Sequence, residues 1–250
     1  MSDMTIEDYL AQGGKLTSPG NVPARYRGEL LRLMASFVDS ELAGAAGFAD
    51  TINDAPGIRN RIAAAKITQE KLDHAGRVLA VMGEFGADMG RYDQRHHWAA
   101  RVDRNADIAA TRRGDDMRLS VFHYPVLGYV DAVVLNVLMG IATAVQLDEM
   151  KRVSYAPLAD TFRAIAPREA RHVELGLNGL RQIIATDEGR AEAVAAIQYW
   201  LPKVEATFGQ AASKRFETLA RFGLRHTENE TLRQLWAQRV RDLLLPMGLA

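Results

Sequence analysis

Apolar residues in the first third of the chain recur at intervals of three and four positions, through Leu30, Leu33, Met34, Phe37, Val38 and Leu42. This spacing is that of one buried helical face. We expect a long helix that Asn21 caps, with Pro23 in its first turn. Ala55-Pro56-Gly57 interrupts the pattern. A second helix is predicted from about Ile58 to Phe85, with Gly86 ending it in the left-handed conformation.

The stretch Ala87 to Met117 is polar and only weakly periodic. It is interpreted as a long crossover with one short helix around His97 to Val102. A third helix is predicted from about Val126 to Arg152, and a fourth from about Pro157 to Ile184. Four long helices in two pairs, joined by one long crossover, indicate an all-α, ferritin-like four-helix bundle. No alternating strand pattern competes with this interpretation.

The last third of the chain is also predicted to be helical. Helices are expected over Arg190 to Phe208 and Ala211 to Gly223, and a last one begins at Thr227. Thr227 and Glu230 have the spacing of a capping box ahead of an apolar face. We expect these C-terminal helices to pack on the bundle or to form a subunit interface.

The composition is that of a soluble globular protein, with 48% hydrophobic and 25% charged residues in 250. It favours a short N-terminal segment, 1–20, followed by a single helical domain, 21–250. The most apolar stretch, Val130 to Val145, is interrupted by Asp131 and Asn136 and is interpreted as a core helix. The N-terminus shows no secretory signal pattern, so we expect a cytoplasmic protein.

Charge and cysteine content exclude several classes of function. Lysine plus arginine equals aspartate plus glutamate, 31 against 31, so nothing indicates nucleic-acid binding. Arg112-Arg113 stands directly before Asp115-Asp116 and is interpreted as part of a solvated loop. The chain has no cysteine, which excludes disulfides, thiolate zinc sites, iron–sulfur clusters and cysteine nucleophiles. Nitrogen and oxygen atoms would therefore hold any metal.

Glu169 and His172 are the first candidates for chemistry, because their i, i+3 spacing places both side chains on one helical face. In di-iron carboxylate bundles, each of two helices brings such a pair and the other two helices each bring a carboxylate. Glu41 lies between apolar positions and is a candidate for an inward-facing carboxylate. One Glu-x-x-His pair alone would also fit a solvent-facing helix.

The second helix supplies His74, but the residue three positions before it is Lys71 and not an acid. Glu70 is four positions before His74 and is expected to share its face. Asp73 is expected to point away from that face. The second helix therefore offers an incomplete version of the pair on the fourth helix.

Separate segments agree in order and spacing with one known family: Phe122-His-Tyr-Pro-Val-Leu-Gly-Tyr-Val-Asp131, Arg152-Val-Ser-Tyr-Ala-Pro157, Ser40-Glu41, and Ala55-Pro56 followed by His74. From about Val22 onward the chain resembles the phenylacetic acid catabolic family, in particular the catalytic A subunit of bacterial phenylacetyl-CoA epoxidase. The resemblance implies a ferritin-like di-iron centre that activates dioxygen and epoxidises the aromatic ring of a CoA thioester. It also implies partner subunits and a separate reductase.

The resemblance assigns metal-ligand roles to matching positions. It implies that Glu41 is a terminal carboxylate ligand and His74 a histidine ligand. It also implies that Glu169 is a bridging glutamate and His172 the second histidine ligand. Two positions depart from the family pattern. Lys71 stands where the family has the first bridging glutamate, and Gly140 stands where it has a carboxylate on the third helix.

These departures argue against an intact di-iron centre. Two ferrous ions bring four positive charges, which two remaining carboxylates do not balance, and Lys71 adds another positive charge. We expect instead that the Lys71 ammonium lies between Glu41 and Glu169 and replaces a metal. The alternative is a single iron, manganese or zinc ion held by Glu41, His74, Glu169 and His172, with Glu70 in support. Gly140 is expected to enlarge the cavity beside the cluster.

Three functions remain open from the sequence, and no catalytic residue is assigned. The first is an oxygen-dependent monooxygenase with an altered metal centre, acting on an acyl- or aryl-CoA thioester. The second is a non-catalytic structural or binding subunit, as in the inactive C-type paralogue that supports the A subunit. The third is a helical interaction domain with a buried polar network. Expected partners are a second copy of the chain, most simply as a dimer, or paralogous epoxidase-type subunits, but not nucleic acid or a membrane.

Overall fold

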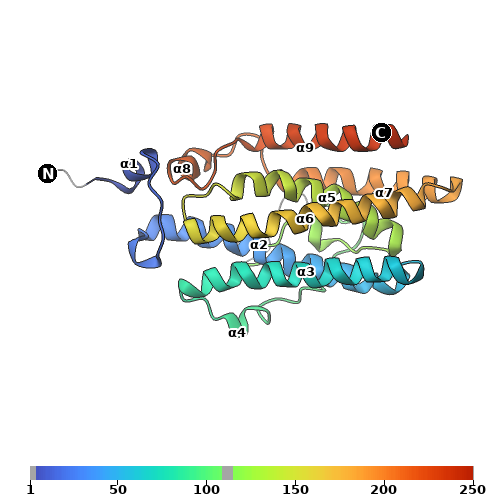
Figure 1. Ribbon diagram of the computed structural model, residues 1–250, viewed down its shortest axis with the longest axis horizontal. Coiled ribbons are helices and arrows are strands. Elements are labelled where there is room, and N and C mark those ends of the chain that lie inside the picture. Colours follow the sequence, from blue (N-terminus) through green and yellow to red (C-terminus); the bar gives the residue numbers. More distant parts are fainter. Residues whose placement is uncertain (1–3, 109–114, 250) are drawn as a thin grey trace.

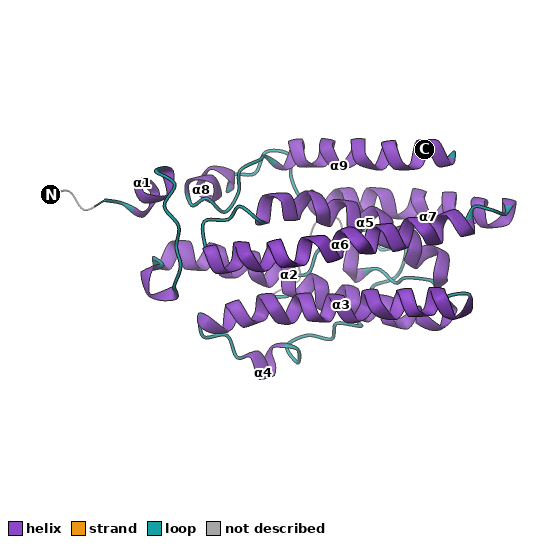
Figure 2. Ribbon diagram, in the orientation of Figure 1, coloured by secondary structure: helices purple, strands orange, loops and turns teal. Residues whose placement is uncertain are grey.

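Four long helices form the centre of the computed structural model, which describes residues 4–108 and 115–249. They are α2 (Ala24–Asp50), α3 (Gly57–Glu84), α5 (Gly128–Met150) and α6 (Ala156–Ile183), and they run along one another in a bundle (Figure 1). Helix α2 packs mainly on α3, and α5 on α6. The described residues form no β-strand, only an isolated bridge between Leu16 and Tyr155 (Figure 2). The predicted all-α, ferritin-like fold is confirmed.

The predicted apolar face of α2 is buried at Leu30, Met34, Phe37 and Val38, which pack in one core with residues of α3 and α6. The predicted cap of this helix is wrong. Asn21 lies in a preceding 3-10 turn, Pro19–Asn21, and Pro23 occupies the capping position without a side-chain hydrogen bond. Helix α3 ends as predicted, since Gly86 adopts a φ of +90° that only glycine accepts at little cost.

Helix α5 is the core helix that the sequence predicts. In the described part of the chain, it is the one helix long and apolar enough to cross a membrane, but 83% of its most apolar window is buried inside the protein. One side of α5 faces α6, and another faces the C-terminal helices. Such burial on several sides explains its nearly continuous apolar sequence.

The described part of the crossover between α3 and α5 contains the short helix α4 (Met89–Tyr92) and a 3-10 turn, Ser120–His123. The predicted helix over His97 to Val102 is wrong, because these residues form turns and irregular chain. Arginine guanidinium groups bind the carbonyls there: Arg101 and Arg118 donate to Trp98, and Arg118 also donates to His97. Those carbonyls are therefore held by side chains rather than by a helical ladder.

The solvated loop predicted around 112–116 is only partly described. Arg112 and Arg113 lie outside the described residues. Asp115 is exposed, as expected, but Asp116 is buried against Arg118 with a 2.8 Å ion pair. The carboxylate of Asp39 on α2 holds the crossover at two points, accepting from the Tyr92 hydroxyl and the Met117 backbone N–H, both at 2.8 Å.

Three further helices follow the bundle: α7 (Asp187–Glu205), α8 (Phe216–Arg221) and α9 (Asn229–Leu244). Of these, α7 and α9 pack on α5. Helix α9 lies on the opposite side of the molecule from α3 (Figure 1). The buried indoles of Trp200 and Trp236 join α7 and α9 to the α5 core. Helix α8 begins five residues later than predicted, after a turn.

The predicted capping box of the last helix is wrong. Thr227 donates its hydroxyl to Glu149 of α5 at 2.7 Å, and Glu230 pairs with Arg233 and Gln234 of its own helix. The Glu149 carboxylate also accepts the backbone N–H groups of His226 at 2.8 Å and Thr227 at 3.0 Å. The carboxylate of Glu149, distant in sequence, therefore accepts hydrogen bonds ahead of α9 in place of the predicted local capping box.

The N-terminal segment is joined to the bundle by backbone hydrogen bonds. Leu16 N donates to Ser154 O at 2.9 Å, and Ala156 N donates to Leu16 O at 2.8 Å. The short helix α1 (Ile6–Ala11) lies beside α8 at the same end of the molecule (Figure 1). The division into 1–20 and 21–250 stays a prediction.

Candidate functional site

A cluster of ionisable side chains lies midway along three helices of the bundle. Helix α2 brings Glu41, α3 brings Lys71 and His74, and α6 brings Glu169 and His172. All five are buried, with 5% exposure or less. The alternative of a solvent-facing Glu169–His172 pair is therefore wrong. Such burial is costly for charged groups unless they are paired.

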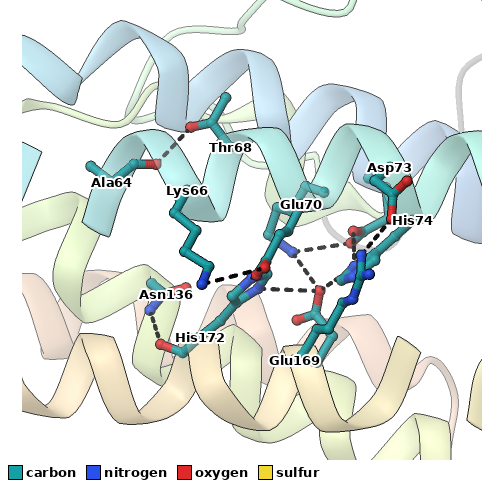
Figure 3. A network of polar contacts seen from close by, with 12 residues as sticks. Ala64, Lys66, Thr68, Glu70, Asp73, His74, Asn136, Glu169 and His172 are labelled. Atoms are coloured by element: carbon teal, nitrogen blue, oxygen red, sulfur yellow. Dashed lines mark hydrogen bonds and ion pairs between the residues drawn. The ribbon is translucent and has the colours of Figure 1, made fainter. Parts of the chain in front are cut away.

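The Oε1 atom of Glu169 is the centre of this cluster. Three nitrogens surround it: His74 Nδ1 at 2.9 Å, Lys71 Nζ at 3.4 Å and His172 Nδ1 at 3.4 Å (Figure 3). The two imidazole rings are stacked with centroids 5.8 Å apart. One carboxylate oxygen therefore meets side chains from both α3 and α6.

Lys71 lies between the two buried carboxylates. Its Nζ is 3.1 Å from Glu41 Oε1 and 3.4 Å from Glu169 Oε1. The i, i+3 relation between Lys71 and His74 places both on one face of α3, so the ammonium lies where the resemblance implies a bridging glutamate. A single positive charge thus bridges α2 and α6.

Electrostatics favour the charged forms of these groups. Burial alone would lower the pKa of the Lys71 ammonium, but the charges of Glu169 and Glu41 outweigh it and raise that pKa. Burial would raise the pKa of Glu169, but Lys71 and the two histidines hold it well below its usual value. Burial would lower the pKa of His74, and its hydrogen bonds to Glu169 and Glu41 raise it overall.

Glu70, which was expected to share the face of His74, contacts His172 in the structure. Its Oε2 is 2.7 Å from His172 Nε2, and Lys66 lies 3.8 Å from its other oxygen. It therefore contacts the second histidine of the candidate site. Asp73 points away as predicted and pairs with Arg77 and Arg168.

The donor set fits one metal ion better than two. Glu41, His74 and Glu169 each offer a ligand atom, and these atoms lie within 4.8 Å of one another. His74 Nε2 is buried and has no hydrogen-bond partner among the described residues. Glu70 also orients His172 as an outer carboxylate orients a ligating histidine. However, the Lys71 ammonium already contacts one oxygen of each of these two carboxylates.

An intact di-iron centre does not fit these residues. Helix α5 faces His172 with a neutral side chain, since Asn136 donates to the His172 carbonyl at 2.8 Å. The enlarged cavity expected beside Gly140 is absent as well. A Cβ atom added at Gly140 would lie 2.7 Å from Val173 Cγ2, so the side chain of Val173 fills that space.

A cleft of about 470 Å³ runs between α2 and α5 under the C-terminal segment, and Glu41 is part of its wall. Sequence reasoning missed it. Its walls come from residues 29–41, 117–150 and 207–229, which no local pattern connects.

An all-helical bundle with a buried carboxylate–imidazole cluster across three helices defines a protein of the ferritin-like class. The chain matches the family model described as phenylacetic acid catabolic protein over residues 14–250, and it belongs to that family. A comparison with curated proteins gives no match. The family assigned by resemblance is thereby confirmed.

Proposed function

We propose that this protein is a non-catalytic, metal-free member of the phenylacetic acid catabolic family, acting as a structural or ligand-binding subunit. The main observation in support of this proposal is the position of Lys71. Its ammonium group contacts a carboxylate of α2 and a carboxylate of α6 at 3.1 and 3.4 Å. It thereby supplies the positive charge that a metal would bring, and it ties the same helices together.

Family membership supports the setting that we propose for this subunit. The family acts in phenylacetic acid catabolism. We propose a cytoplasmic protein that assembles with a second copy of itself or with paralogous epoxidase-type subunits. The cleft that reaches Glu41 is the place where such a subunit would hold a ligand.

A monooxygenase with one metal ion is the second candidate. It is favoured by the buried Nε2 of His74 and by the carboxylate of Glu70 behind His172. Glu41, His74, Glu169 and His172 would hold one iron or manganese ion after Lys71 had moved aside. Such an ion would supply oxygen-dependent redox chemistry.

Metal analysis separates these two candidates. The full chain is expressed with added iron and manganese, purified without chelator, and measured by elemental mass spectrometry. We expect less than stoichiometric metal, with no difference between the native chain and His172→Ala. One metal ion per chain, lost in His172→Ala but kept in the exposed-site control His97→Ala, would overturn the metal-free proposal and establish the one-metal site.

A further inference from the structure

We propose that the cleft between α2 and α5 binds an amphipathic carboxylic acid, and that Arg225 anchors its carboxylate. This inference deepens the proposed function by naming the class of ligand. Arg225 lies in the connection before α9, on the wall of the cleft. The ligand class follows from the contacts of this guanidinium, the charges around it and the depth at which it lies.

Arg225 is a cation held in place by neutral groups. Its Nη1 donates to Gln146 Oε1 at 2.8 Å and its Nη2 donates to Asn229 Oδ1 at 3.0 Å. Within the described residues, it forms no ion pair with any carboxylate. Glu149, whose charge acts on Arg225, is already engaged by Thr227, His226 and Arg152.

Burial lowers the pKa of Arg225, and the charge of Glu149 offsets only part of this effect. A guanidinium nevertheless stays protonated in proteins. The amide oxygens of Gln146 and Asn229 orient the guanidinium. Because both are neutral, they do not balance its charge. An anion in the cleft would balance it and would gain a charge-assisted hydrogen bond.

The other charges of the cleft reinforce this preference for an anion. Arg215 is paired with Glu29, and Glu41 is paired with Lys71. Arg32 also lines the cleft and, like Arg225, has no ion pair among the residues described. Among the described residues that line it, the cleft therefore has two arginines without an ion pair and no carboxylate without one.

The position of Arg225 along the cleft favours a carboxylic acid over a thioester as the ligand. Gln146, which holds Arg225, is seven residues from Met139 on α5, and Met139 lines the cleft together with Glu41. At 1.5 Å per residue, about 10 Å along the axis of α5 separates Gln146, beside Arg225, from Met139, near Glu41. Phe37, Phe122 and Phe208 line the cleft and suit the apolar body of a ligand. A thioester group at the level of Arg225 would be neutral and would leave its charge unbalanced, whereas a carboxylate would not.

Calorimetric titration of the full chain tests the proposal with octanoate, octanol and coenzyme A as probes. We expect octanoate to bind at least about tenfold more tightly than octanol, because octanol lacks the charge. Arg225→Gln should weaken octanoate binding at least about tenfold. Arg225→Lys should keep part of the affinity, and the exposed control Arg221→Gln should keep all of it. Thr143→Trp, which fills the cleft, should abolish binding.

Several results would overturn the inference. They are equal affinity for octanoate and octanol, unchanged octanoate binding by folded Arg225→Gln, or no octanoate binding by the native chain. Coenzyme A that displaces octanoate and depends on Arg225 would point to phosphate recognition and would overturn the choice of a carboxylate. The inference and the proposed function fail separately, because these titrations do not depend on metal content and metal analysis does not depend on the cleft.

Discussion

At the scale of single residues, the charge of Lys71 decides what the buried cluster can hold. A glutamate at this position would add a third carboxylate between α2 and α6 and favour cations. The lysine instead neutralises the two carboxylates already there, at 3.1 and 3.4 Å. The same two carboxylates could be metal ligands or ion-pair partners, and the side chain at position 71 favours one of these roles over the other.

We expect Lys71→Met to destabilise the protein by about 3 to 5 kcal/mol, because it leaves two buried carboxylates without their cation. Urea unfolding followed by circular dichroism measures the change. Lys66→Met is the matched control on the same helix, since Lys66 is largely solvated and lies 3.8 Å from Glu70. It should cost less than about 1 kcal/mol. Equal effects of the two substitutions would contradict the proposed role of Lys71.

At the scale of elements, α9 is positioned by a carboxylate from α5. Glu149 accepts hydrogen bonds from the Thr227 hydroxyl and from two backbone N–H groups just before the helix. Burial would raise the pKa of Glu149, but these donors and Arg152 lower it overall. The contact holds the C-terminal segment over the cleft. This pairing between α5 and the start of α9 therefore contributes to the shape of the cleft.

We expect Glu149→Gln to cost about 1 to 3 kcal/mol at pH 7, since the amide cannot accept all these hydrogen bonds. The folded pKa of Glu149 is below its ordinary value of 4.5, so its stabilisation is present above pH 4.5 and is lost as pH falls through the folded pKa. The difference in unfolding free energy between the two proteins should therefore shrink below pH 4.5. The adjacent exposed control, Asp148→Asn, should show neither effect.

Hydrogen exchange adds a local measurement to this comparison. Glu149→Gln should increase exchange at the start of α9, around Leu232, more than in α3. A uniform increase over the whole chain would indicate global destabilisation and would contradict the anchoring role.

At the scale of the whole molecule, the buried cluster connects α2, α3 and α6 and should shape the dependence of stability on pH. The folded pKa of Glu169 is lowered, so its contribution is complete above 4.5 and is lost in acid. The folded pKa of His74 is raised, so its contribution is complete below 6.5 and is lost as pH rises through the folded value. Together they should contribute most between about pH 4.5 and 6.5.

The comparison of the native chain with His74→Gln tests this pH window. The free energy of unfolding should differ most between the two proteins near pH 5 to 6 and less at pH 9. The exposed control His97→Gln should follow the native chain at every pH. A difference that grows as pH rises would show that the imidazole of His74 is neutral in the folded protein.

Much of the architecture follows from local rules that the sequence displays directly. The apolar period of α2, the break at Ala55-Pro56-Gly57 and the left-handed Gly86 predicted the long helices to within a few residues. The inward positions of Glu169 and His172 also follow from helical periodicity, because residues three apart share a face.

The sequence alone could not predict which side chains satisfy one another across helices. Glu70 contacts His172 of the facing helix, and Val173 fills the space beside Gly140. Glu149 replaces the predicted capping box, and the crossover carbonyls are held by Arg101 and Arg118.

Helical periodicity thus determined the long helices and the inward face of each candidate residue. Tertiary structure decided the partners, the cleft and the position of Arg225, which has no ion pair with a carboxylate among the described residues. The physical reason is that periodicity depends on neighbours one turn away along the chain, whereas ion pairs and cavities depend on how helices distant in sequence rotate and pack against one another.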